Sequence, residues 1–397
     1  MGEDFALVSR KNYISMAVTM AVMMPACAGA TDGLMFSGYS ATTLGMAGAG
    51  SAGAVDAQTG ATNPAGFAFT GNRLDITGAL LAVDIDTTIG GTQYGDNPLL
   101  PVVLPSFSYQ YDDRWSFGLS SYGVGVTVDY GEPIPAVPGV TDASATLLQF
   151  VLAPSVAYKL NEDHAVGASL LLAGQYFDMT GLQAFGVADP GYATSYGAGV
   201  SVGYMGRLSD TVRVSAAYFS RIEMGQLDGY EGHLASETDL DMPARIVLGV
   251  AVDVTSDLTM FLDYNWIDWS SVRPLANPFP GNFVLGSADG PGGGWGSQHV
   301  VKIGAEYKLS DQWTIRGGAS ASNEVWDSKD NALNYYTPAT PRYHLAAGAT
   351  YRSGNNTEWT VAWNRAIAQE QDGEGMSTGT DLKTQIDTFA LTFGWTF

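Results

Sequence analysis

The sequence predicts an all-β protein, a transmembrane antiparallel β-barrel of about fourteen strands with an N-terminal plug (hatch) in its lumen. Only 15% of the 397 residues are charged, whereas soluble domains carry about 25%. After residue 30 there is no run of 18 or more apolar residues, which argues against membrane-spanning helices. From residue 73 onward, large apolar residues instead alternate with small or polar ones, as in a wall between lipid and a lumen.

Residues 1–30 are predicted to be a secretory signal peptide. Arg10 and Lys11 precede an apolar stretch at 13–24, and the small residues 28–30 form a cleavage site. Cys27 is the only cysteine, and it leaves with the signal unless it is a lipoprotein acceptor, for which its context is a poor match. The mature chain therefore contains no disulfide, and its stability must come from barrel closure.

Residues 31–72 are predicted to form the plug. They are rich in Gly, Ala, Ser and Thr, carry little charge and lack the alternation of a strand. A lumen bounded by fourteen strands is too wide for wall side chains alone to fill. A compact segment of small residues placed inside it is therefore physically expected.

Residues 73–397 are predicted to form the barrel. Val301, Ile303 and Tyr307 would face lipid while Lys302 faces the lumen, and the odd-numbered large residues of the last strand, up to Phe397, would also face lipid. Short connections alternate with long ones (86–103, 130–144, 179–192, 223–241, 269–296, 324–340 and 368–381), which places both termini in the periplasm. The predicted strands are 73–85, 104–112, 115–129, 145–160, 164–178, 193–208, 211–222, 242–255, 257–268, 297–309, 312–323, 341–352, 357–367 and 382–397.

A series of motifs resembles one known family. A glycine-rich stretch at 45–53 is followed by Asp56 and by Asn63-Pro64-Ala65 just before the first strand. Further matches follow in the family's order, at 117–119 with 122–124, 154–160, 218–221, 242–244, 269–270 and 316–318. The sequence is similar in this respect to the long-chain fatty acid transporters of the outer membrane (FadL and TodX type) over nearly all of residues 33–397. At 218–221 it reads Tyr-Phe-Ser-Arg, where the family more often has Tyr-Arg-Ser.

The resemblance implies passive uptake of a hydrophobic compound. The ligand would be captured by the extracellular loops, bind in the lumen, and leave sideways through the wall after the hatch rearranges. The exit would lie where the third strand bends inward, and glycines in that strand favour such a bend or a close approach, although they also suit ordinary barrel packing. The predicted hatch and gating residues are Phe36, Asn63, Pro64, Ala65, Gly118, Tyr122, Gly123 and Gly125.

Basic residues on the lumen side of the strands are the candidates for binding a ligand carboxylate. They are Arg221, Arg245, Lys302, Arg316 and Arg342, of which Lys302 and Arg316 would lie deeper than the other three. The alternative is that they pair with luminal acids or with the plug. The family's own carboxylate-binding residues do not align with a motif here, so none is carried over. A neutral aromatic or alkane hydrocarbon therefore stays open as the substrate, as does a general porin for hydrophilic solutes.

Other functions are disfavoured by composition and by the motifs present. A formal net charge of −22 argues against nucleic acid as a partner. The four histidines show neither metal-ligand spacing nor a paired nucleophile, so we expect no enzyme, no metal and no cofactor. The expected partners are hydrophobic small molecules, outer-membrane lipid with lipopolysaccharide, and the barrel-assembly machinery through the C-terminal Phe397. The expected form is a monomer in the outer membrane of a Gram-negative bacterium.

Overall fold

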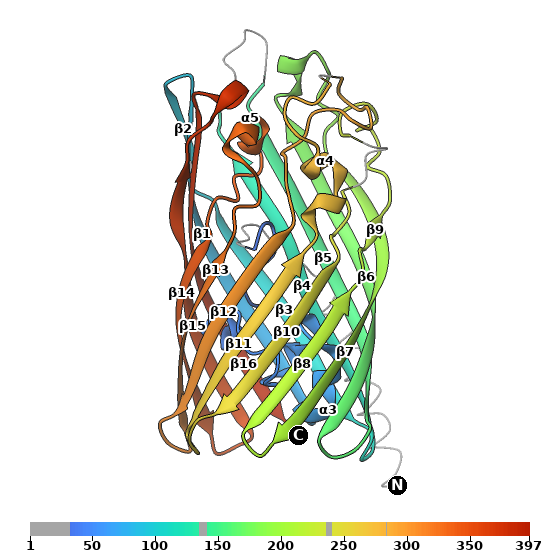
Figure 1. The fold of residues 1–397 in the computed structure, drawn as a ribbon, viewed down its shortest axis with the longest axis vertical. Coiled ribbons are helices and arrows are strands. Elements are labelled where there is room, and N and C mark those ends of the chain that lie inside the picture. Colours follow the sequence, from blue (N-terminus) through green and yellow to red (C-terminus); the bar gives the residue numbers. More distant parts are fainter. Residues whose placement is uncertain (1–31, 135–140, 236–239, 283) are drawn as a thin grey trace, which may run out of the picture.

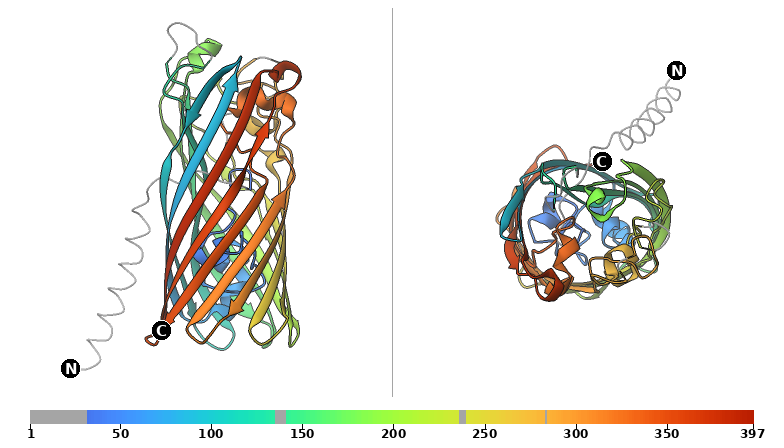
Figure 2. Two further views of the ribbon diagram at one scale, coloured as in Figure 1. Left: turned by 90° about the vertical axis from the view of Figure 1, so that its left-hand side faces the viewer. Right: turned by 90° about the horizontal axis from the view of Figure 1, so that it is seen from above.

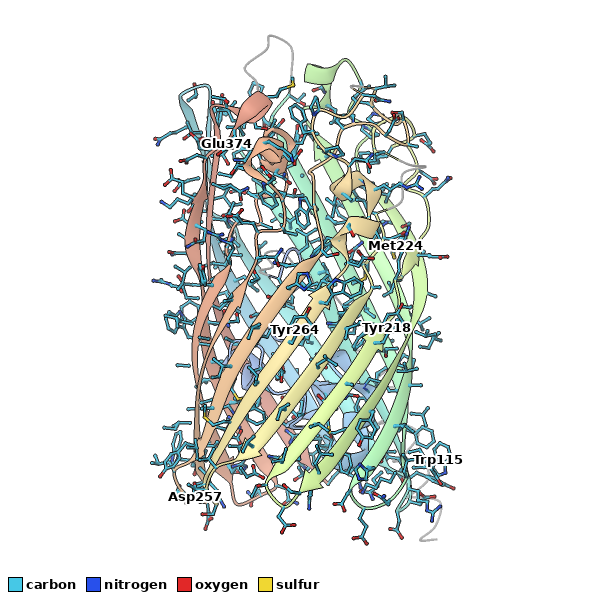
Figure 3. All side chains as sticks on the ribbon, viewed as in Figure 1. Trp115, Tyr218, Met224, Asp257, Tyr264 and Glu374 are labelled. Atoms are coloured by element: carbon cyan, nitrogen blue, oxygen red, sulfur yellow. The ribbon has the colours of Figure 1, made fainter. Side chains whose placement is uncertain are left out.

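The computed structural model describes residues 32–134, 141–235, 240–282 and 284–397. It is a closed, tilted β-barrel with short turns at one end, the turn end, and long loops at the other, the loop end (Figure 1). The predicted signal peptide, residues 1–30, lies outside the described residues. Figure 3 places Trp115 and Asp257 at the turn end and Glu374 at the loop end.

Fourteen long strands form the wall, as predicted. Each pairs antiparallel with its neighbour in sequence, and the last pairs with the first over 17 residues, so the ring is closed. The short strands β2 (Thr92–Asp96) and β9 (Glu223–Met224) add to this ring by pairing with β1 and β7. The wall strands are β1 (Arg73–Ile89), β3 (Leu99–Gln110), β4 (Trp115–Asp129), β5 (Ser144–Lys159), β6 (His164–Thr180), β7 (Ala193–Ser209), β8 (Val212–Phe219), β10 (Arg245–Asp253), β11 (Leu258–Ile267), β12 (Gln298–Lys308), β13 (Trp313–Ser322), β14 (Tyr343–Ser353), β15 (Thr357–Gln371) and β16 (Thr380–Thr396).

The predicted alternation of the two faces is confirmed. On β12, Val301 and Ile303 are 50% and 48% exposed on the outer face, whereas Lys302 between them is 2% exposed. On β16, Phe389 and Leu391 are exposed outside while the intervening residues are buried. Because the side-chain period of a strand is two residues, one choice of face decides the position of every residue in that strand.

Two of the predicted long connections are wrong. Most of 86–103 is strand, because β1 continues to Ile89 and turns directly into β2, with which it pairs. The connection predicted at 368–381 is shorter than expected, spanning 372–379, since β15 reaches Gln371 through a bulge between Ala366 and Gln369 and β16 begins at Thr380. The helices in the loops are single turns, such as α4 (Arg273–Ala276) and α5 (Asn331–Asn334). No helix of the described residues is long and apolar enough to cross a membrane.

Residues 32–72, called here the luminal segment, lie inside the barrel (Figure 2). They form the short helices α2 (Ala41–Leu44), η1 (Ala57–Ala61), η2 (Pro64–Gly66) and α3 (Phe67–Thr70). Small residues on both sides allow the segment to approach the wall. A Cβ on Gly318 of β13, for example, would lie 2.4 Å from the backbone of Met46, so no larger residue fits there without displacing the segment.

Buried charges at the turn end join the luminal segment to the wall. Arg73 donates to both carboxylate oxygens of Asp75 at 2.8 and 2.6 Å and also pairs with Glu358 at 2.6 Å. The same Asp75 carboxylate accepts the backbone N–H of Ala57 at 2.7 Å. One carboxylate on β1 therefore holds both a wall arginine and the start of η1.

We predict that Asp75→Ala destabilises the folded barrel by about 3–5 kcal/mol, because it leaves a buried arginine with one partner and a buried N–H with none. Urea unfolding in lipid bilayers measures this free energy. The control is Asp86→Ala on the same strand, whose exposed carboxylate lies 3.8 Å from Lys383 and should contribute about 1 kcal/mol or less. Equal losses for the two variants would contradict the assignment.

Candidate functional site

The barrel wall is interrupted between β3 and β4. Their ladder joins only Phe107–Gln110 to Ser116–Leu119, whereas β4 pairs with β5 along its whole length. Beyond Leu119 the alternation of β4 also stops, and all residues from 120 to 126 are buried. The strand therefore bends into the lumen, and its edge separates from β3 in the half nearer the loop end.

Of the three predicted glycines of this strand, Gly118 lies just before the bend and Gly123 and Gly125 lie within it. Gly118 packs directly on the luminal segment, because a Cβ there would lie 2.2 Å from the ring of Phe67. Gly123 and Gly125 lie in the buried stretch, next to Tyr122, whose ring centroid is 5.3 Å from that of Tyr39. Gly118, Tyr122 and Gly125 therefore lie where the wall contacts the luminal segment, and Gly123 is buried next to Tyr122.

The luminal segment occupies the free edge of β4. Residues 32–35 form a tight turn in which Asp32 and Met35 exchange backbone hydrogen bonds. Gly125 then donates its N–H to the carbonyl of Leu34 at 3.1 Å, and Met35 bridges to Val124.

The side chain of Gln58 hydrogen-bonds to the same edge of β4, closer to the turn end. It donates to the carbonyl of Ser121 and, at 3.3 Å, to that of Tyr39. Backbone groups of β4 that would otherwise bond to β3 thus find partners inside the barrel.

Phe36, one of the predicted hatch and gating residues, is buried beside Tyr39 with their ring centroids 6.4 Å apart. It lines a small recess together with Met35, Arg245 and Ile267. The recess has room for about one water molecule, so no hydrophobic ligand fits there unless the luminal segment moves.

Asn63, Pro64 and Ala65 form a turn that contacts the wall at β6 and β7. The Asn63 side chain donates to the carbonyl of Tyr204 on β7 at 2.8 Å and accepts the N–H of Ala65 at 2.9 Å. Wall glycines make this approach possible. A Cβ on Gly203 would lie 2.0 Å from the side-chain Oδ1 of Asn63, and one on Gly167 would lie 2.5 Å from the backbone of Pro64 and Ala65.

Four of the five candidate ligand-binding bases already have acidic partners. Lys302 is buried and contacts the Asp32 carboxylate at 2.6 Å. This ion pair joins the wall to residues 32–35 of the luminal segment, called here the tip. The sequence interpretation did not single out Asp32, although an isolated acid in a nearly uncharged segment was a signal for it. The remaining pairs are Arg221 with Asp241, Arg316 with Glu306 and Arg342 with Glu324.

Arg245 differs from the other bases. It stands at the loop end of β10 but is 6% exposed rather than open at the rim, because Tyr39 and Ala61 of the luminal segment cover it. Its guanidinium lies 3.9 Å from the ring centroid of Phe219 and 5.2 Å from that of Tyr122. Within the described ranges Arg245 forms no ion pair.

Two acids share the recess with Arg245, and both are engaged elsewhere. Asp32 is paired with Lys302, and Asp263 accepts the backbone N–H groups of Gly50 and Ser51, each at 2.9 Å. The recess thus combines apolar surface with Arg245, whose guanidinium is surrounded by aromatic rings and two neutral oxygen acceptors, while the second cation, Lys302, is paired with Asp32.

Residues 22–397 match the profile of a family described as outer membrane protein transport protein (OMPP1/FadL/TodX). The chain belongs to this family. It is therefore an outer-membrane β-barrel of a Gram-negative bacterium, from a family that transports hydrophobic compounds across the outer membrane.

Solved structures with the same fold include two toluene transporters and a FadL homologue. The toluene transporter TodX of Pseudomonas putida is 17% identical, with 91% of this chain and 99% of that chain covered and a TM-score of 0.69. A FadL homologue of Pseudomonas aeruginosa is 19% identical (92% and 100% covered, TM-score 0.68). The toluene transporter TbuX of Ralstonia pickettii is also 19% identical (91% and 99% covered, TM-score 0.67). No curated protein sequence matches the chain.

We predict that Gly203→Val displaces the Asn63 turn from the wall and lowers uptake without preventing assembly, since the ring of strands stays paired. Replacing both Asn63 and Pro64 by alanine in the otherwise unchanged protein should also alter uptake without preventing assembly. Radiolabelled substrate uptake by whole cells measures the effect, and heat-modifiable mobility in gels reports assembly. The control is Gly78→Ala on β1, where a Cβ meets nothing within 4 Å. Unchanged uptake in the Asn63 and Pro64 variant would exclude a gating role for the turn.

Proposed function

We propose that this protein is a passive channel that takes up long-chain fatty acids or similar hydrophobic compounds and releases them sideways into the outer membrane. The extracellular loops capture the ligand, which binds in the lumen before the luminal segment moves. The ligand then leaves between β3 and β4. The observation that carries this proposal is the four-residue ladder between these strands, with the open edge occupied by Leu34, Met35 and Gln58.

Sideways release follows from the cost of exposing a hydrophobic molecule to water. Each Å² of apolar surface brought into the periplasm costs about 25 cal/mol, whereas passage from the lumen into lipid avoids that cost. The luminal segment blocks the direct route, because it is anchored at the turn end through Asp75 and through the Asn63 turn. The part that moves is the tip, residues 32–35, which occupies the free edge of β4.

A carboxylate headgroup is favoured by Arg245. A buried guanidinium without an acidic partner is costly, and an incoming carboxylate would supply charge-assisted hydrogen bonds. The aromatic rings around it would contact the adjoining methylene chain. Neutral aromatic hydrocarbons are the second candidate class, because TodX and TbuX are described as toluene transporters. A general porin is disfavoured, since the luminal segment fills the bore.

The lipid-facing surface suggests the further partners. The ring of Phe397 stacks on that of Phe107 at 6.0 Å, at the exposed end of the last strand. This placement suits a C-terminal signal read by the barrel-assembly machinery. We further propose that the protein works as a monomer among lipopolysaccharide and lipid.

A reversible cross-link tests the sideways route. Met35→Cys with Val124→Cys places two thiols at the bridge between the tip and β4. Oxidation should abolish uptake, because it holds the tip on the strand edge, and reduction should restore it. The control is the wall pair Val301→Cys with Ala321→Cys, which face each other on β12 and β13. Full uptake with the first pair oxidised, or a large steady conductance of the unmodified channel in planar bilayers, would refute the proposal.

We predict that Arg245→Met weakens fatty acid binding roughly ten- to hundred-fold, the equivalent of losing about 1.5–3 kcal/mol of charged hydrogen bonding. Uptake of toluene should be much less affected, because a neutral ring has no charge to pair. Fluorescent fatty acid titration of the detergent-solubilised protein measures the change. The matched control is Arg342→Met near the loop end, paired with Glu324. Equal losses for the fatty acid and toluene would show that Arg245 is structural.

A further inference from the structure

The unpaired edge of β3 carries two prolines, Pro101 and Pro105, in the part of the strand that β4 leaves. Proline has no backbone N–H and so cannot donate to a neighbouring strand, which confines it to edges and bulges. Whether these two prolines affect β4 depends on which neighbour the backbone groups at positions 101 and 105 face.

The orientation of the β3 backbone follows from bonds near the turn end. Tyr111 donates its N–H to the carbonyl of Trp115 at the start of β4, whereas Gln110 donates towards β1, to the side chain of Asn72. The backbone N–H and C=O groups of successive residues point to opposite neighbouring strands. Those of the odd-numbered residues of β3 therefore face β4. Ser121 of β4 confirms this, because its hydroxyl donates to the carbonyl of Pro105 at 2.6 Å.

Both prolines therefore remove a donor from the edge that faces β4. Extending the register of Phe107 opposite Leu119 would place Pro105 opposite Ser121 and Pro101 opposite Gly125. In a complete antiparallel ladder each of these pairs would exchange two hydrogen bonds, and each proline eliminates one of them. Only Val103 between them could pair fully.

The luminal segment bonds at the same two positions of β4. Gln58 donates to the carbonyl of Ser121, the acceptor that Pro105 cannot serve, and Leu34 accepts the N–H of Gly125, opposite Pro101. We propose that Pro101 and Pro105 are positioning residues that prevent β4 from hydrogen-bonding to β3 along its whole length. The edge of β4 therefore stays available to the luminal segment. When that segment moves, the wall stays open instead of closing behind it. This inference rests on the proposed sideways release.

The test restores the missing donors with Pro101→Val and Pro105→Val, which keep an apolar, strand-forming side chain at each position. Pairing of β4 with β3 is detected independently of transport by adding Val103→Cys and Gly123→Cys, which the extended register places opposite each other. We expect an oxidative cross-link in the double-valine background and none in the proline background. The control is Pro154→Val on β5, an exposed wall proline away from the β3 edge, which should allow no cross-link.

Uptake of the cysteine-free valine variants separates this inference from the proposed function. Loss of uptake together with cross-linking supports both. Cross-linking with full uptake keeps the role of the prolines and overturns sideways release. If assembled double-valine barrels do not cross-link above the proline background, the inference is refuted, whatever their uptake. The single Pro105→Val variant gives the same readout if the double variant assembles poorly.

Discussion

The structure depends on one constraint, that a backbone polar group facing lipid must find a hydrogen-bond partner within the protein. Thirteen of the fourteen junctions between wall strands meet it by long ladders, including the closing one between β16 and β1. The junction of β3 with β4 meets it differently, since β4 turns its edge inward to residues 34, 35 and 58. The wall can thus be incomplete without exposing the edge of β4 to lipid.

The lumen obeys a related constraint on charge. A buried ion is tolerated when an opposite charge or several hydrogen bonds compensate for its lost hydration. Asp75 and Lys302 meet this condition by joining the wall to the luminal segment, so the contacts that neutralise charge also position the segment. Arg245 meets it with aromatic faces and two neutral oxygens, which is why it stands out among the luminal bases.

Much of the fold could be predicted because its main signal is local. Alternation along β12 and β16 reveals which residues face lipid, and the turns between strands reveal their number. The predictions failed over parts of 86–103 and 368–381, because the polar strand residues at 86–96 and 368–371 resemble a loop in composition. Without an apolar face to mark a strand, only pairing with a neighbour defines it.

The sequence by itself determined the closed ring, the two faces of its wall and a segment of small residues suited to its interior. Only the tertiary structure decided which bases are neutralised, how deeply Arg245 is covered and where β4 leaves its neighbour. The difference has a physical origin. The face of a residue follows from a two-residue repeat, whereas the contact of Lys302 with Asp32 joins positions 270 residues apart. Such a contact depends on how the closed barrel and the luminal segment fit together.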